Sequence, residues 1–471
     1  MTAPKIIFGT DGWRAIIAED FTLQNLSRVA KATGLWIRKN YPNKLTVAVG
    51  YDCRFMGAKF AQHVADILSQ MGIRVILSTD FCSTPMVSLA TVHFNCAAGI
   101  IITASHNPPE YNGYKIKGYF GGPATPEMIS EIESLIDTPI DTNFSPAGIE
   151  KENFETLYLN HLKQNFDIEL IRKKIHVVYD AMYGAGQRVL QHLGLNGTFL
   201  RCEYNPSFMG QAPEPIHKNL IQLSKTVSQI AKIQPKDQLV IGLATDGDAD
   251  RIGLYDENGK FIDSHHILLL LIYYLHKQKG LSGKVVTTFS CTQKISELCK
   301  KYNLPHQVTK IGFKYICQIM LNEKVIVGGE ESGGIAIIGN VPERDGIFIG
   351  LTIMEFMAKT GKKLSELVQT IYDEIGTFAM ERYDLHVSES EKQHILTHCK
   401  NNAYTHFGNL QVKSIESIDG YKFHFENGEW VMIRPSGTEP ILRVYAEAST
   451  LERAVDILNQ TKNTILSQQN S

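Results

Sequence analysis

Short runs of Val, Ile and Leu recur along the chain, and each closes on a polar or glycine-rich turn. They span residues 45–49, 97–102, 175–179, 239–243, 284–288 and 325–327. Sequence typical of helices follows each run, and this alternation predicts βαβ units built around buried strands. In open α/β sheets, ligands bind beyond the carboxyl ends of strands, so we expect the turns after these runs to carry the chemistry.

The C-terminal part of the chain has a different pattern. Apolar runs at 430–434 and 442–446 flank the turn Pro-Ser-Gly-Thr-Glu-Pro, and a segment with apolar residues at helical spacing follows from Leu451. Two short strands and a helix are expected there. The polar stretch 137–151 is interpreted as a linker, and a weaker break follows the turn 256–259. The fold class predicted is α/β, with three mixed α/β domains and a smaller C-terminal α+β domain.

Charge and composition exclude several kinds of protein. The 471 residues include 47 basic and 49 acidic ones, a net charge of −2, too balanced for a protein that holds nucleic acid mainly by neutralising phosphates. No apolar run reaches the roughly 18 residues of a membrane span, and the first residues lack a signal-peptide pattern. The eight cysteines form no C-x-x-C pair, which argues against a disulfide framework or a zinc site. We expect a cytoplasmic protein with no nucleic-acid or membrane partner.

The strongest local signal is a group of three carboxylates. Asp246, Asp248 and Asp250 alternate directly after the run 239–243. Clustered like charge requires a cation, and oxygen-only ligands suit Mg²⁺. An EF-hand loop is an alternative, but Arg251 stands where its turn glycine belongs and the flanks resemble strands. A solvated acidic turn is the second alternative.

The second signal is the segment Thr-Ala-Ser-His-Asn-Pro, residues 103–108, at the end of the run 97–102. Ser105 could be a nucleophile, although the Gly-x-Ser-x-Gly elbow is absent and neighbours such as Ser105 and His106 usually point apart. Taken alone, the segment is more typical of a helix N-cap or turn. A phosphorylated serine would carry about −1.5 to −2 charge and would need a dication such as the aspartates could hold.

Two further turns could bind an anion and a sugar. Residues 434–440, Arg-Pro-Ser-Gly-Thr-Glu-Pro, and Arg443 offer guanidinium groups, hydroxyls and an open glycine backbone, which together could cradle a phosphate. The alternative is a hairpin turn with surface charges. Residues 328–334, Gly-Gly-Glu-Glu-Ser-Gly-Gly, offer carboxylates and a hydroxyl suited to sugar hydroxyls, although acidic glycine-rich turns are common.

The four turns, in this order, resemble the α-D-phosphohexomutase superfamily of phosphoglucomutases, phosphomannomutases and phosphoglucosamine mutases. The resemblance extends from Phe-Gly-Thr-Asp-Gly-Trp-Arg at 8–14 to Arg443. It implies four domains around a central cleft. We expect residues 1–147 to form the domain that carries the phosphoserine and residues 148–256 the domain that binds the metal. Residues 257–370 are expected to form the sugar-binding domain, and residues 371–471 the phosphate-binding domain.

The resemblance also implies residue roles. Ser105 is similar to the phosphoserine and, with Asp246, Asp248 and Asp250, to the Mg²⁺ ligands. The remaining catalytic candidates are Arg14, His106, Lys115 and Arg251, with Lys115 as the general acid/base candidate. The substrate-binding candidates are Lys310, Glu330, Ser332, Arg434, Ser436, Gly437, Thr438 and Arg443, and Lys314 competes with Lys310.

The activity implied is interconversion of hexose 1-phosphate and hexose 6-phosphate, with glucose 1,6-bisphosphate as intermediate and activator. The expected partners are hexose phosphates, and the protein is expected to be a monomer or a homodimer. Glu331 is the residue type of glucose-directed members, whereas glucosamine-directed members have Gln there. Glucose is also expected to be preferred over mannose. Phosphomannomutase and phosphoglucosamine mutase remain alternatives. Gly334 stands where many members have His, which predicts extra room near the sugar. A phosphatase with Asp246 as nucleophile is a remote alternative, and it leaves Ser105 without a role. A Ca²⁺-binding module is weaker still.

Overall fold

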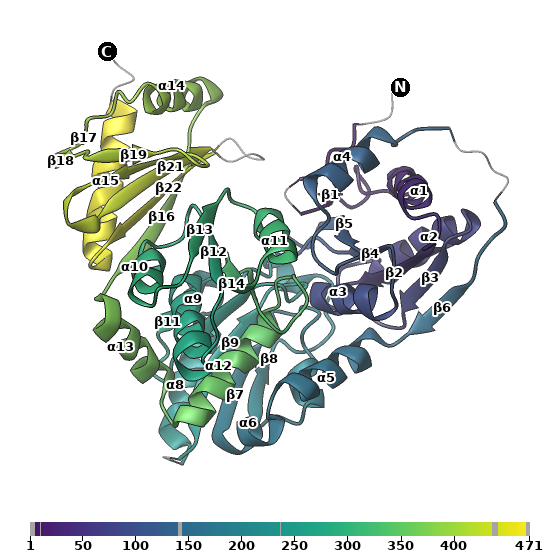
Figure 1. Cartoon of the computed structure of the whole chain (residues 1–471), viewed down its shortest axis with the longest axis horizontal. Helices are drawn as coiled ribbons and strands as arrows, with labels where there is room; N and C mark the ends of the chain where they lie inside the picture. The colour runs from purple at the N-terminus through teal and green to yellow at the C-terminus, as the bar shows by residue number, and fades with distance from the viewer. Residues whose placement is uncertain (1–4, 10, 140–143, 236, 436–440, 468–471) are drawn as a thin grey trace. The chain divides into compact units, whose positions relative to one another are not determined.

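The computed structural model describes residues 5–9, 11–139, 144–235, 237–435 and 441–467 (Figure 1). The chain forms two compact units, one of residues 1–286 and 312–369 and one of residues 287–311 and 370–471. In the part of the chain so described, helices are too short or too polar to cross a membrane.

The first unit begins with a six-stranded sheet in the order β1-β5-β4-β2-β3-β6. Its strands are β1 (Trp13–Ile16), β2 (Thr46–Tyr51), β3 (Arg74–Ser78), β4 (Ala98–Ile102), β5 (Tyr111–Gly118) and β6 (Ile149–Glu152). Its helices are α1 (Leu23–Asn40), α2 (Gly57–Gln70), α3 (Thr84–His93) and α4 (Pro126–Ser134). Strand β6 pairs in parallel with β3, so part of the expected linker 137–151 is a strand of this sheet.

A second sheet follows in the order β11-β10-β9-β7-β8. It contains β7 (Ile175–Asp180), β8 (Gly197–Leu200), β9 (Leu239–Thr245), β10 (Ile252–Tyr255) and β11 (Phe261–Ile262). The surrounding helices are α5 (Phe154–Asn165), α6 (Ile168–Lys174), α7 (Val189–His192) and α8 (Ile221–Ile233). Every residue of β9 is buried, as its continuous apolar sequence predicts for a strand covered on both faces. The turn 256–259 joins the antiparallel strands β10 and β11.

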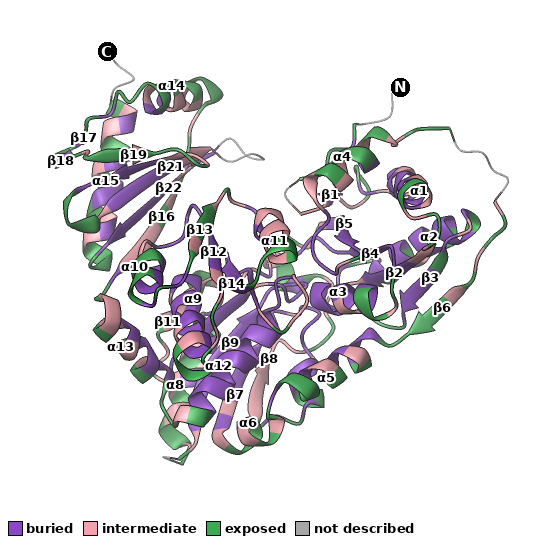
Figure 2. Cartoon of the chain, viewed as in Figure 1, coloured by how far each residue is buried: buried purple, intermediate pink, exposed green. Residues whose placement is uncertain are grey.

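The rest of the first unit includes helix α12 (Gly346–Thr360). Strands β14 (Val325–Gly329) and β15 (Ile335–Ile337) pair antiparallel, and β12 (Lys284–Thr288) begins in this unit. The other helices are α9 (Ser264–Tyr273), α11 (Phe313–Asn322) and α13 (Leu364–Ile375), which ends in the second unit. Helix α12 contacts β9, β10 and β15 and is buried along most of its length (Figure 2).

The second unit is built on a five-stranded sheet in the order β16-β22-β21-β20-β19. Its strands are β16 (Ala379–His386), β19 (Ser414–Glu416), β20 (Tyr421–His424), β21 (Trp430–Pro435) and β22 (Ile441–Ala448), all paired antiparallel. Helix α15 (Leu451–Ser467) packs against β16 and β22. The remaining elements are α10 (Lys294–Lys301), β13 (His306–Thr309), α14 (Glu389–Lys400) and the hairpin of β17 (His406–Phe407) and β18 (Leu410–Gln411). The predicted α/β architecture with a smaller C-terminal α+β domain is confirmed.

Candidate active site

Ser105 lies in the tight turn between β4 and β5. Its φ of 54° is in the left-handed region, and only 1 % of the residue is exposed. The Ser105 backbone N–H donates to Thr103 Oγ1 at 2.9 Å, and the Thr103 hydroxyl donates to Asp52 Oδ2 at 2.5 Å. These bonds offset the cost of the unusual backbone and fix where the Ser105 hydroxyl points.

Arg54 holds the other side of this turn, and the sequence analysis did not single it out. Its guanidinium donates to the carbonyl oxygens of Ser105 at 2.8 Å and Asn107 at 2.6 Å, and also to those of Pro108 and Tyr111. Burial raises the pKa of Asp52 to about 6, although Arg54, 3.4 Å away, opposes the rise. The sequence feature that could have identified Arg54 is its position: residues 52–54 directly follow strand β2, as the other candidate turns follow their strands.

The three aspartates follow β9 and meet the serine turn. Oxygen atoms of Asp246, Asp248 and Asp250 lie within 4.8 Å of one another, and all three residues are fully buried. The Ser105 hydroxyl donates to Asp246 Oδ2 at 2.7 Å across 141 positions of sequence. Burial and the neighbouring Asp248 and Asp250 raise the pKa of Asp246 well above its usual range. The structure thus joins the two strongest sequence signals, and the burial excludes a solvated acidic turn.

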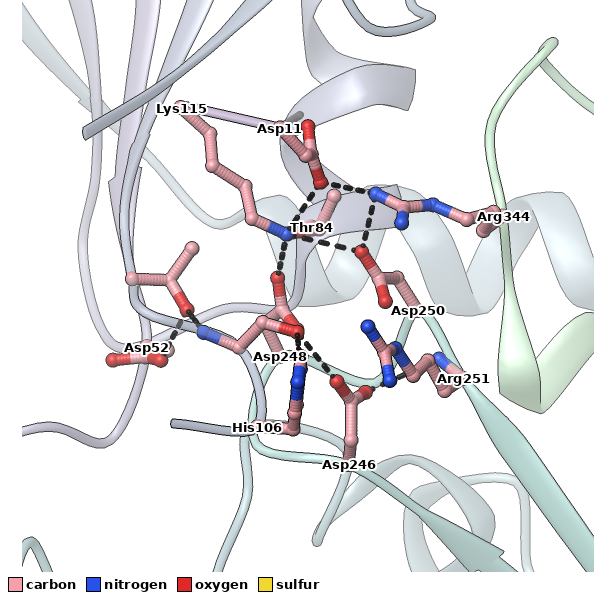
Figure 3. Close-up of polar contacts among 12 residues, drawn as sticks. Asp11, Asp52, Thr84, His106, Lys115, Asp246, Asp248, Asp250, Arg251 and Arg344 are labelled. Atoms are coloured by element: carbon pink, nitrogen blue, oxygen red, sulfur yellow. Dashed lines mark hydrogen bonds and ion pairs between the residues drawn. The ribbon is translucent and has the colours of Figure 1, made fainter. Parts of the chain in front are cut away.

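Lys115, on β5, lies among these carboxylates (Figure 3). Its ammonium is 2.7 Å from Asp248 Oδ2, 3.1 Å from Asp250 Oδ2 and 2.9 Å from Asp11 Oδ2. Burial alone would lower the pKa of Lys115, but the three carboxylates outweigh it and raise the pKa above the ordinary value. Lys115 is therefore a charged group at neutral pH.

Two carboxylate oxygens of the aspartate cluster are available to bind a cation. Among the described residues, buried Asp248 Oδ1 and Asp250 Oδ1 have no hydrogen-bond partner. Buried carboxylate oxygens without partners are costly, and a hard divalent cation such as Mg²⁺ would satisfy them. The EF-hand alternative is wrong, because the loop is flanked by β9 and β10 and not by helices.

Three further catalytic candidates surround the serine turn. Arg14, on β1, donates to Asn107 Oδ1 at 2.7 Å, and the Arg251 backbone N–H donates to Asp246 Oδ1 at 3.1 Å. His106 Nδ1 lies 3.4 Å from Ser105 Oγ, so the expectation that these neighbours point apart is wrong here. Burial, together with Arg251 and Arg14, lowers the pKa of His106 well below its ordinary value, so the imidazole is neutral at pH 7.

The turn with Glu330 and Ser332 joins β14 to β15 in the same unit. Glu330 Oε1 accepts a hydrogen bond from the Gly312 N–H at 3.0 Å. Burial raises the pKa of Glu330 to about 7, although nearby Arg344 opposes the rise. The Gly333 carbonyl accepts from the Ile252 N–H at 3.1 Å, which ties this turn to the strand after the aspartates. The structure therefore brings Glu330 near Arg344, whose guanidinium also contacts Asp250.

The extra room expected beside Gly334 is absent. A Cβ at this position would lie only 2.5 Å from Cδ of Arg344, a residue that the sequence analysis did not consider. The expectation is wrong because a neighbouring arginine side chain already fills the space. A lone arginine before α12 carried no sequence signal that would have identified it.

The phosphate-clamp candidates belong to the second unit. Arg434 on β21 pairs in register with Arg443 on β22, and Arg434 Nε is 3.5 Å from Asp419 Oδ2. Ser436, Gly437 and Thr438 lie outside the described residues. Lys310 is exposed in the second unit, whereas Lys314 lies on α11 in the first.

Comparison with known proteins gives similarity along nearly the whole chain. The phosphoglucomutase/phosphomannomutase alpha/beta/alpha domains I, II and III match residues 5–142, 156–259 and 263–375, and the C-terminal domain of that family matches 389–463. A Thermococcus kodakarensis phosphoglucomutase/phosphomannomutase is 32 % identical over 96 % of both chains.

A phosphoglucosamine mutase and a solved structure are similar at the same level. The Methanocaldococcus jannaschii phosphoglucosamine mutase is 31 % identical over 96 % of this chain and 97 % of its own. A solved structure of a Thermus thermophilus protein described as a phosphomannomutase is 32 % identical, covers 98 % of this chain and 100 % of its own, and superposes with a TM-score of 0.85.

Proposed function

The chain belongs to the phosphoglucomutase/phosphomannomutase family and is an intramolecular phosphotransferase, and from that premise we propose that it interconverts hexose 1-phosphates and hexose 6-phosphates through a phosphoserine at Ser105. The observation that carries this proposal is the buried Ser105 hydroxyl, 2.7 Å from an aspartate of the three-carboxylate cluster. A nucleophile in contact with a cation-binding cluster suits phosphoryl transfer, where charge neutralisation and positioning supply most of the catalysis.

The proposed cycle conserves the phosphoryl group. A free sugar hydroxyl attacks the phosphorus on Ser105 and gives up its proton, the bond from phosphorus to Ser105 Oγ breaks and that oxygen takes up a proton, and a hexose 1,6-bisphosphate remains bound. After the intermediate turns over, Ser105 Oγ attacks its other phosphorus and gives up a proton. The bond from that phosphorus to the sugar oxygen breaks, the oxygen takes up a proton, and the hexose monophosphate leaves while Ser105 is phosphorylated again. Lys115 is the acid/base candidate, and Arg14 and Arg251 lie near the serine turn, where their charge would neutralise the transferring group.

A divalent cation fits the carboxylate cluster. Asp246, Asp248 and Asp250 would hold Mg²⁺, with Asp248 Oδ1 and Asp250 Oδ1 offering buried oxygens that lack a partner among the described residues. When bound, the cation would neutralise charge that develops on the phosphoryl oxygens. The test is an assay of glucose 1-phosphate with catalytic glucose 1,6-bisphosphate. Formation of glucose 6-phosphate supports the proposal, and release of free phosphate instead would favour an aspartate-nucleophile phosphatase.

Arg434 and Arg443 are proposed to clamp the phosphate that is not transferred. Replacing either by Ala should raise KM for hexose 1-phosphate and hexose 6-phosphate together, because a charge-assisted bond worth roughly 1.5–3 kcal/mol is lost, or about 10- to 150-fold. Steady-state kinetics in both directions measure this. Arg382→Ala is the matched control, since Arg382 is an arginine of the same sheet paired with Asp384. Unchanged KM in both clamp variants would make the turn a simple hairpin.

The sugar preference is a separate expectation. Glucose 1-phosphate is expected to be the best substrate, mannose 1-phosphate slower and glucosamine 1-phosphate poorest. Glu330 and Ser332 would contact the 3- and 4-hydroxyls, which glucose and mannose share, so discrimination at carbon 2 rests on fit, worth roughly 10- to 200-fold in kcat/KM. Arg344 fills the space beside Gly334, so the sugar site is not enlarged there. Gly334 therefore gives no reason to expect that the enzyme accepts a wider range of sugars.

Phosphoglucosamine mutase is the second candidate, favoured by the Methanocaldococcus jannaschii relative at 31 % identity. Measuring kcat/KM for the three sugar 1-phosphates decides between them. A higher value for glucosamine 1-phosphate would overturn the glucose assignment, and the phosphoserine mechanism would stand.

A further inference from the structure

Arg344 connects two parts of the site that the sequence does not link. It is 5 % exposed, and its guanidinium bridges Asp11 and Asp250, with Nη2 2.8 Å from Asp250 Oδ2 (Figure 3). The next residue, Asp345, caps α12 by accepting from the Phe348 N–H at 3.0 Å. The Gly346 N–H donates to the Ala249 carbonyl within the aspartate loop at 3.0 Å. The backbone that carries Arg344 is thus bonded directly to the loop of the metal-ligand candidates.

Gly334 gives Arg344 the space that this position requires. A Cβ at 334 would be 2.5 Å from Cδ and 3.2 Å from Cγ of Arg344, and the next nearest atom, Glu330 Oε2, would be at an ordinary 3.5 Å. The φ of Gly334 is outside the left-handed region, so its backbone conformation would accept other residues. The glycine is therefore needed for space and not for conformation, and the arginine is what occupies that space.

The two oxygens of Asp250 have different surroundings. Oδ2 contacts both Lys115, at 3.1 Å, and Arg344, at 2.8 Å. Oδ1 is buried without a hydrogen-bond partner in the described structure. Two cations on one oxygen fix the carboxylate plane and leave the other oxygen available to a metal, as groups behind a metal ligand commonly do.

We propose that Arg344 is a positioning residue that orients Asp250 for a divalent cation, and that Gly334 serves to make room for it. This inference rests on the part of the proposed function that assigns a cation to the three aspartates. Arg344 is not required to neutralise its partners, because Lys115 also contacts Asp11 and Asp250. Its third partner, Glu343, is also paired with Lys117 at 2.5 Å. Variants at 344 should therefore fold, and their defect should be in metal affinity.

The test is a double-mutant cycle of Arg344→Ala and Gly334→Ala in which the dissociation constant for Mn²⁺ is measured. Mn²⁺ serves as the probe for Mg²⁺, and titration calorimetry on the unphosphorylated full chain without sugar keeps the readout separate from turnover. We expect Arg344→Ala to weaken Mn²⁺ binding roughly 10- to 100-fold, the range seen when a group supporting a metal ligand is removed. Gly334→Ala should weaken it similarly, because its methyl group displaces the arginine. Adding Gly334→Ala to Arg344→Ala should change nothing further, since the side chain it would displace is gone.

Matched variants exclude simpler explanations. Gly148→Ala adds a methyl group where no atom lies within 4 Å and should leave Mn²⁺ affinity unchanged. Arg344→Lys keeps the positive charge on a shorter side chain. It should recover part of the Mn²⁺ affinity that is lost in Arg344→Ala. Thermal unfolding without metal verifies that each variant folds.

The possible results are distinct. Wild-type affinity in Arg344→Ala, or no Mn²⁺ binding by the wild type, overturns the inference. Equal losses from Gly334→Ala in both backgrounds overturn the role of Gly334. If the cycle behaves as expected but hexose phosphates are not interconverted, the proposed function fails while the inference stands.

Discussion

Ser105→Ala should lower mutase turnover by at least about 10³-fold while leaving hexose phosphate binding largely intact. The scale is that of removing an enzyme's nucleophile, because Ser105 is the proposed carrier of the covalent phosphate. The Ser105 hydroxyl is buried and 2.7 Å from Asp246 Oδ2, whereas the proposed phosphate clamp belongs to the second unit. Steady-state kinetics and direct titration with glucose 6-phosphate separate the two effects.

The phosphoserine itself can be measured by mass. Wild-type protein exposed to glucose 1,6-bisphosphate should gain one phosphoryl group, located at Ser105 by peptide mapping, and Ser105→Ala should gain none. Ser134→Ala is the control, since Ser134 is an exposed serine on α4 whose hydroxyl donates to the Glu131 carbonyl. Full turnover in Ser105→Ala, or a phosphate found solely at another residue, would refute the assignment.

Asp248→Ala should lose most activity through loss of the cation. Asp248 Oδ2 accepts from the Thr84 hydroxyl at 2.5 Å and contacts Lys115 at 2.7 Å, so its position is fixed. Its Oδ1, which has no partner among the described residues, would be available to the proposed cation. Without a cation, the remaining buried carboxylates repel one another and a phosphate on Ser105 would be uncompensated. We expect a fall in kcat of roughly 10²-fold or more, together with loss of measurable Mn²⁺ binding.

Metal removal gives the same test on the unaltered chain. EDTA should abolish wild-type turnover, and added Mg²⁺ should restore it. Asp66→Ala, at an exposed aspartate on α2 that pairs with Gln62, should behave as wild type. Full activity after chelation would contradict the metal assignment.

The hydrophobic pattern predicted the strands that are covered on both faces. The apolar runs at 97–102 and 239–243 coincide with β4 (Ala98–Ile102) and with most of β9 (Leu239–Thr245), and every residue of these two strands is buried. Strand β5 gave no such signal, since its sequence YNGYKIKG contains Lys115 and Lys117. These lysines are buried in ion pairs with Asp11, Asp248 and Glu343, and no local pattern announces partners so far along the chain.

The sequence by itself determined the kinds of chemistry available. Carboxylates, a serine and arginines follow strand ends, and this placement depends on local pattern alone. Only the tertiary structure decided which groups meet, since the contact of Ser105 with Asp246 spans 141 positions and the ion pair of Arg344 with Asp11 spans 333. It also decided that Gly334 leaves no empty space, because Arg344 occupies it. The physical reason is that such contacts depend on how several elements pack together, which residue spacing does not encode.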